Sequence, residues 1–192
     1  MSHPDFVRSR SGFTLLEILV ALALIGLLAG ALVPTVLNQL GKGESNRFVE
    51  DLRSVGEATK LFRADVSRWP ASVDHLVQQP GAAEQDLAGQ TIPAAGLARW
   101  GGPYLERSSL QTDGSLPTAA GATINGDFEP ITWNLSPYLA IRVAGVTQTQ
   151  GRAVSQVVDG DTIVGNTATP DATSAVRWLT GDTLVYLVAP VN

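Results

Sequence analysis

The sequence predicts an α+β protein in which a long N-terminal helix packs on a small antiparallel sheet. Three observations support this fold class. An unbroken apolar run covers residues 13–33, an apolar stripe of helical period continues to residue 62, and short segments of alternating polarity fill the C-terminal third. We therefore expect a helix with two different halves, followed by one modest globular head.

Composition excludes several classes of function. The 192 residues carry a formal net charge of −5, and the 13 Lys and Arg residues form no basic stripe. No nucleic-acid binding is predicted for this chain alone. The absence of cysteine excludes disulfides and thiolate sites, and two histidines are too few for the usual zinc arrangements.

The first element is a predicted transmembrane helix. Residues 13–33 would extend for ~31 Å as a helix, which matches a hydrocarbon core of ~30 Å. Arg8 and Arg10 precede the apolar run. The positive-inside rule then places the leader in the cytoplasm and the rest of the chain outside, as a single-pass protein.

One carboxylate interrupts this apolar segment. Glu17 would cost about 2.5–3.5 kcal/mol at the bilayer centre, so a partner is expected for it. Cleavage between Gly12 and Phe13 would create an amine on Phe13 at a similar depth. That amine can pair with Glu17 of the same helix or with Glu17 of a neighbouring subunit, and only the second arrangement drives assembly.

These residues carry a resemblance to a known family. The basic leader ending in Gly12, the sequence from Phe13 to Glu17 and the apolar run resemble the class III signal of type IV pilins and type II secretion pseudopilins. The resemblance implies cleavage by prepilin peptidase, N-methylation of Phe13, and polymerisation with other subunits at a bacterial inner-membrane assembly platform. Pro34 falls where the family commonly has a proline.

Alternatives for the same segment remain. An ordinary signal peptide would be cut after Ala29-Gly30-Ala31 and would release an exported binding domain, but it leaves Glu17 unexplained.

Gly26 and Gly30 have the spacing of a close-packing helix face. The resemblance instead suggests that the helix melts locally between Gly26 and Pro34 in a filament. A third interpretation is a continuous helix that is kinked at Pro34.

The second half of the long helix is amphipathic. It is expected to end near Ala64, since Pro70 and the residues before it break the pattern. Ser72 is the predicted N-cap of a short helix over 73–78. The apolar stripe contains Val36, Leu37, Leu40, Phe48, Leu52, Val55, Thr59 and Phe62.

The predicted organisation has four parts, and the resemblance implies the shape of a pilin lollipop. They are a leader at 1–12, a transmembrane and filament-core helix at 13–34, an amphipathic half at 35–65, and an α+β head at 66–192.

The head is less regular than the helix. Residues 79–130 are rich in Gly, Ala, Pro and Ser, so we expect them to wrap the helix or to hold short strands. The four tryptophans are expected in packing positions. Strands are predicted at 131–133, 138–143, 153–158, 176–178 and 183–188.

Two further segments favour a subfamily. The Trp69-Pro70 turn with its short helix, and the sequence at 100–105, resemble major pseudopilins of type II secretion. The leading prediction is thus a structural subunit of a secretion pseudopilus. The alternative within the family is a type IV pilin for adhesion, motility or DNA uptake.

One loop is a candidate cation site. Asp159, Asp161 and Asp171 offer the hard oxygen ligands that calcium prefers, and major pseudopilins are known for calcium in a C-terminal loop. The same Gly- and Asp-rich pattern also serves turn geometry alone. No other cofactor is expected.

No catalytic site is expected. His75 next to Asp74 is interpreted as a surface histidine, since no nucleophile elbow accompanies it.

Overall fold

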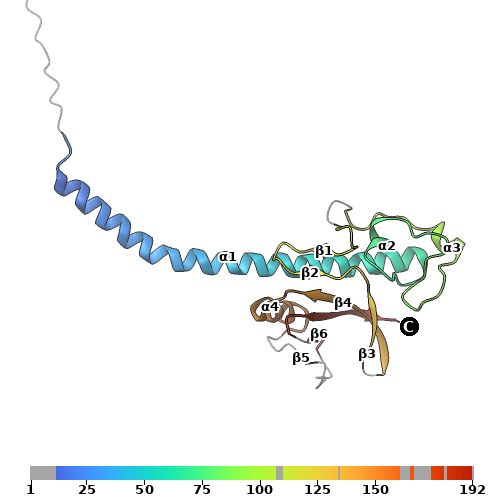
Figure 1. The fold of residues 1–192 in the computed structure, drawn as a ribbon. Coiled ribbons are helices and arrows are strands. Elements are labelled where there is room, and N and C mark those ends of the chain that lie inside the picture. The colour runs from blue at the N-terminus through green and yellow to red at the C-terminus, as the bar shows by residue number, and fades with distance from the viewer. Residues whose placement is uncertain are drawn as a thin grey trace, which may run out of the picture. The chain divides into compact units, whose positions relative to one another are not determined.

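The computed structural model describes residues 12–106, 110–133, 135–160, 165–166, 174–179 and 181–191, with only the backbone described at 34–42 and 165–166. The chain divides into two compact units, Met1–Lys42 and Gly43–Asn192. Helix α1, Leu15–Val66, belongs to both units and confirms the predicted long helix (Figure 1). The helix continues through Pro34 without a break. Each unit is described below by itself.

The head half of α1 buries the predicted stripe. Phe48, Leu52, Val55, Thr59 and Phe62 are each at most 1% exposed. Their spacing of three and four residues places them on one helical face, where they join the main hydrophobic cluster of the head. The amphipathic pattern therefore identified the inner face of the helix correctly.

Helix α1 ends close to the position that the sequence predicts. Ser67 follows the last helical residue and adopts a left-handed backbone with φ of 60°. Trp69 and Pro70 then turn the chain back over the helix, with Trp69 7% exposed. The predicted break before Pro70 is confirmed, because a residue that precedes proline disfavours helical geometry.

A mainly antiparallel sheet packs on this helix. Its order is β1-β2-β4-β7-β6-β5, with β3 also paired to β4 and with β5 parallel to β6. The strands are β1 Leu116–Pro117, β2 Thr123–Ile124, β3 Glu129–Trp133, β4 Ser136–Ala144, β5 Gly165–Asn166, β6 Val176–Trp178 and β7 Leu184–Pro190. Four predicted strands are thus confirmed, as β3, β4, β6 and β7.

The two faces of the sheet have different cores. Leu139 and Ile141 of β4 join the cluster that contains the α1 stripe. Ala140, which lies between them, joins a smaller cluster with Trp133 and Leu187. Since side chains alternate along a strand, the second cluster lies on the face turned away from α1. A single sheet therefore separates one large and one small core.

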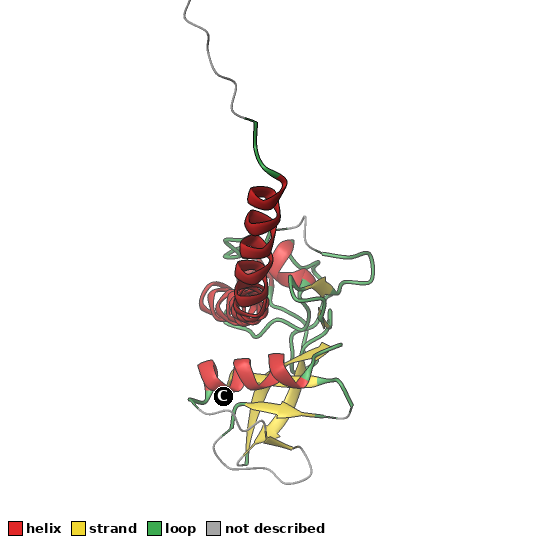
Figure 2. Cartoon of the chain, turned by 90° about the vertical axis from the view of Figure 1, so that its left-hand side faces the viewer, coloured by secondary structure: helices red, strands yellow, loops and turns green. Residues whose placement is uncertain are grey.

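The strand predicted at 153–158 is wrong. This segment belongs to helix α4, Gln148–Val158 (Figure 2). Thr147 and Gln150 form a reciprocal capping box at its start. Val154 is fully buried in the main cluster of the head. The local cap and the burial of one helical face decide the structure, although the short sequence also fits alternation.

The segment between Pro70 and β3 holds two four-residue helices, α2 Asp74–Val77 and α3 Ala94–Leu97, together with the short strands β1 and β2. This confirms the expectation of short elements in the region. The N-cap prediction was wrong, because Val73 occupies the cap position of α2 in the described structure, without a side-chain capping bond. Ser72 instead forms an isolated bridge with Asp127.

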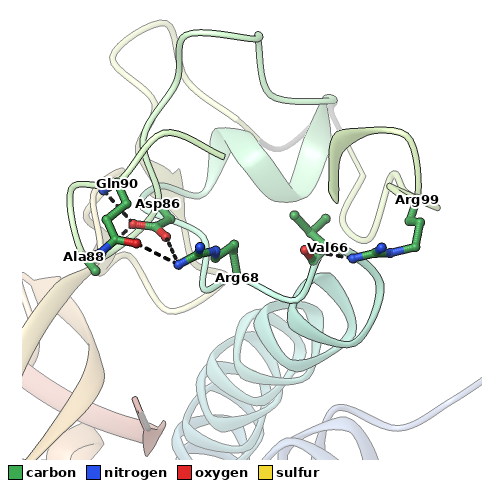
Figure 3. A network of polar contacts seen from close by, with 6 residues as sticks. All are labelled: Val66, Arg68, Asp86, Ala88, Gln90 and Arg99. Carbon is green, nitrogen blue, oxygen red and sulfur yellow. Dashed lines mark hydrogen bonds and ion pairs between the residues drawn. The ribbon is translucent and has the colours of Figure 1, made fainter. Parts of the chain in front are cut away.

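Polar contacts fasten this segment to the end of α1 (Figure 3). Arg99 donates from Nε to the Asp65 carbonyl at 2.8 Å and from Nη2 to the Val66 carbonyl at 3.4 Å. A guanidinium at the last carbonyls of a helix satisfies acceptors that have no intrahelical partner. Arg68, just past the helix, donates to Asp86 and Gln90 in the same segment.

Candidate functional site: the N-terminal segment of α1

The described part of the chain contains one helix that is long and apolar enough to cross a membrane, over Leu15–Val33 with a mean hydropathy of 2.6. Its apolar side chains are exposed, as Leu15 at 83% and Leu27 at 73% illustrate. A stretch of this size cannot remain in water, so lipid or other helices must cover it. The structure therefore supports a membrane-anchored chain.

The start of α1 places Glu17 in its first turn. The helix begins at Leu15, and the Glu17 amide donates to Thr14 Oγ1 at 3.2 Å and to the Thr14 carbonyl at 3.1 Å. Thr14 thus acts as the N-cap of the helix. The positive end of the helix dipole favours a carboxylate at the position of Glu17.

Sequence reasoning missed the capping role of Thr14. The signal was present, because Thr14-Leu15-Leu16-Glu17 has the T-x-x-E spacing of a capping box. The cap fixes where the helix starts. Phe13 lies before the cap, and Gly12, on the other side of the predicted cleavage point, is exposed and outside the helix.

Two glycines leave open space on the apolar helix. Among the described residues, a Cβ added at Gly26 or Gly30 would meet no heavy atom within 4 Å. Packing inside this chain therefore does not require either glycine. Small residues on an apolar helix allow a neighbouring helix to approach closely, which keeps the close-packing prediction for this face.

Of the three candidate calcium ligands, the structure describes only Asp159. Asp159 is the C-cap of α4, and its carboxylate accepts the Ala175 amide at 2.7 Å and the Val176 amide at 3.2 Å. These hydrogen bonds link the C-terminal end of α4 to the start of β6. Asp161 and Asp171 lie outside the described residues.

Elsewhere in the described residues, no group of three or more His, Asp or Glu side chains is arranged to hold a metal. Calcium binding in this loop stays a prediction.

His75 is buried, which corrects the surface interpretation. Its side chain stacks on Phe62 of α1 with ring centroids 6.0 Å apart, and the residue is 5% exposed. Nδ1 accepts the Ala71 amide at 3.3 Å, while Nε2 lies 2.9 Å from Glu84. Burial lowers the pKa of His75, and the Glu84 carboxylate opposes this effect. These contacts give the ring a structural role in closing the segment after α1.

The tryptophans occupy packing positions, as expected. Trp69 and Trp133 are 7% and 9% exposed, and Trp100 and Trp178 pack half-buried against the main cluster. Trp100 also donates from Nε1 to the His75 carbonyl at 3.1 Å.

Comparison with known proteins identifies the family. Residues 7–33 match the prokaryotic N-terminal methylation motif, a match that includes Gly12, Phe13 and Glu17. The chain is 32% identical over 103 residues to type II secretion system core protein G of Aeromonas hydrophila, covering 50% of this chain and 72% of that protein. The chain belongs to the family of type II secretion system core protein G. The resemblance to pseudopilins drawn from the N-terminal residues is confirmed.

Other members support the same assignment. Core protein G of Klebsiella pneumoniae is 29% identical over 104 residues, which cover 51% of this chain and 74% of that protein. The protein of the same name from Escherichia coli (strain K12) is 32% identical over 72 residues, covering 36% and 50% respectively. No solved structure shows a significant match to the chain. The family likeness thus covers about half of this pseudopilin.

Proposed function

We propose that this pseudopilin is a structural subunit that polymerises with further copies into the filament of a type II secretion system. The observation that carries the proposal is one apolar, exposed helix that is capped by Thr14 and holds Glu17 in its first turn. The family relatives are named as secretion-system core proteins, which supports secretion over adhesion, motility or DNA uptake. We infer a structural rather than an enzymatic role.

Processing would prepare the helix for assembly. Prepilin peptidase cuts between Gly12 and Phe13 and methylates the new N-terminus, in keeping with the methylation motif over 7–33. The Phe13 amine then lies one residue before the Thr14 cap. Anchoring in the inner membrane follows from the apolar span, and the head lies in the periplasm because Arg8 and Arg10 hold the leader in the cytoplasm.

Assembly would pair charges between subunits. Glu17 lies within the apolar span, where an isolated carboxylate is costly. The Phe13 amine of a neighbouring subunit neutralises it, and the inner-membrane assembly platform brings the two helices together. Pro34 and the two open glycines, Gly26 and Gly30, give neighbouring helices room to adjust and to approach closely.

The first test is the N-terminal sequence and intact mass of the protein from a membrane fraction. A start at Phe13 with one added methyl group is expected. A start at Leu32 in a soluble fraction would indicate an ordinary signal peptide and would refute the filament proposal.

The pairing role of Glu17 is tested by E17A and E17Q. Leaving one partner of a buried ion pair alone costs about 3–5 kcal/mol, which weakens subunit affinity by at least about 100-fold. Both variants should still be cleaved and methylated, yet give few filaments in a sedimentation assay. A wild-type filament yield from either variant would remove Glu17 from the assembly mechanism.

A further inference from the structure

The β3–β4 hairpin carries an unusual leucine at its tip. Leu135 is 99% exposed, and its backbone has φ of 66°. It lies in the tight connection between the strands, since Trp133 pairs with Ser136. Such connections favour Asn, Asp or Gly at positive φ, so leucine is disfavoured here both by its backbone and by its contact with water. A strained and exposed apolar residue points to a contact outside the subunit.

A groove elsewhere on the head has the volume to receive such a side chain. It has a volume of about 220 Å³ and lies between α1, β1 and residues 105–106. An apolar cavity of about 150 Å³ can bind benzene, so the groove has room for the isobutyl group of leucine. Its apolar lining consists of Val55, Leu105, Leu116 and Pro117.

Two carboxylates also line the groove, those of Asp51 and Glu106. Asp51 accepts the Ala119 amide at 3.0 Å, which fixes the end of β1 against α1. Val55, another lining residue, is 1% exposed and belongs to the main core, so core packing holds this part of the lining in place. A preformed apolar groove loses little freedom when it binds a small side chain.

The exposed leucine and the groove belong to different parts of the head, since neither Leu135 nor any described residue of β3 or β4 lines the groove. Figure 1 shows β1 and β2 alongside the head half of α1, whereas β3 extends away from that helix. The near-complete exposure of Leu135 shows that the chain does not fill its own groove with this residue. A contact between two different surfaces of identical subunits is heterologous, and it continues along an open assembly unless its rotation closes a ring.

We propose that Leu135 of one subunit docks into the groove formed by Val55, Leu105, Leu116 and Pro117 of a second copy of this chain. This contact joins the heads of successive subunits along the filament. It adds to the attraction between the N-terminal helices. The inference rests on the proposed function as a filament subunit. The occupant is a second copy because both halves of the contact, an exposed apolar side chain and a groove large enough to hold it, are present on the same chain.

Disulfide trapping tests the contact directly, since the chain contains no cysteine of its own. The full-length L135C/L116C variant, assembled in the membrane of a host with a prepilin pathway, should form a ladder of dimers, trimers and longer products on mild oxidation. Each single variant should remain monomeric. A control pair, L135C with L61C, places the second thiol on an exposed part of α1 outside the groove and should form no ladder.

A second variant separates docking from folding. L135N replaces leucine by a residue that tolerates positive φ, so the head should unfold at the same or a higher temperature. Loss of one buried leucine should weaken the contact by about tenfold or more and should lower filament yield accordingly. Cleavage after Gly12 and membrane insertion should be unchanged.

The outcomes are distinct. A ladder specific to L135C/L116C, with a reduced filament yield for L135N, supports docking. Filaments from both the wild type and L135N in equal amounts would refute the docking contact but leave the proposed function intact, as would filaments of L135C/L116C that give no ladder. If the wild-type protein forms no filaments, the proposed function fails and the docking inference fails with it.

Discussion

Replacing Asp86 should show which contacts hold the segment after α1 in place. The Asp86 side chain is 3% exposed. Its Oδ1 accepts the Ala88 amide at 3.0 Å and the Gln90 amide at 2.9 Å, and its Oδ2 lies 3.4 Å from Arg68 Nη1 (Figure 3). The Asp86 carboxylate therefore accepts backbone hydrogen bonds and also forms an ion pair with Arg68. These two kinds of interaction differ in strength.

The backbone bonds should dominate. A hydrogen bond to a charged group contributes about 1.5–3 kcal/mol, whereas an ion pair with an exposed partner contributes about 0–1 kcal/mol. The Arg68 side chain is 38% exposed, and its distance to Asp86 is long for an ion pair. We expect D86A to lower the free energy of unfolding by about 3 kcal/mol, D86N by about 1 kcal/mol because it keeps an acceptor, and R68M by less than about 1 kcal/mol.

Urea titration of the detergent-solubilised chain, followed by tryptophan fluorescence, measures these differences. Trp69 is buried beside this segment and should report its unfolding. The order D86A, D86N, R68M is the essential result. If R68M destabilised the protein as much as D86A, the ion pair would be the main contact. If D86A were within about 0.5 kcal/mol of the wild type, the backbone bonds would carry no net stability.

Two further predictions concern the head. Burial lowers the pKa of His75 below its ordinary value of 6.5, so the unfolded state takes up the proton first, and stability present above pH 6.5 should be lost as the pH falls below it. Urea midpoints between pH 8 and pH 5.5 should fall further for the wild type than for H75Q, and parallel curves would contradict this. G151A should lower the melting temperature of the solubilised chain, because a Cβ there would lie 2.6 Å from the Trp178 ring, a clash of about 1–3 kcal/mol that exceeds the gain of about 1 kcal/mol from helix propensity. An equal or higher melting temperature would show that the indole moves aside without cost.

The long helix could be predicted because its signals are local and repeated. The stripe that contains Phe48, Leu52 and Phe62 repeats over several turns, and a single error in it would not change the assignment. The helix end could be predicted because Pro70 restricts the residue before it. Both features depend only on residues that are close together in the sequence, and the structure places them as expected.

The head was predicted less completely because its structure depends on contacts between distant residues. The alternation at 153–158 is too short to distinguish a strand from a helix, and the capping box formed by Thr147 and Gln150 decides for the helix. That box was visible in the sequence. The burial of His75 was not visible, since it depends on Phe62 and Glu84, which reach it from separate parts of the chain.

The two candidate contacts between subunits differ in the same way. Glu17 could be recognised without a structure, because a carboxylate in an apolar span is anomalous in any fold. Leu135 could not, because an exposed leucine is ordinary until its positive φ, its position at a hairpin tip and the groove near α1 are known together. Charge pairing inside the membrane would bring subunits together with little orientational preference of the heads. A leucine that fits one groove would then fix the orientation of each head relative to the next, so loss of Leu135 should leave subunits able to associate but less able to extend an ordered filament.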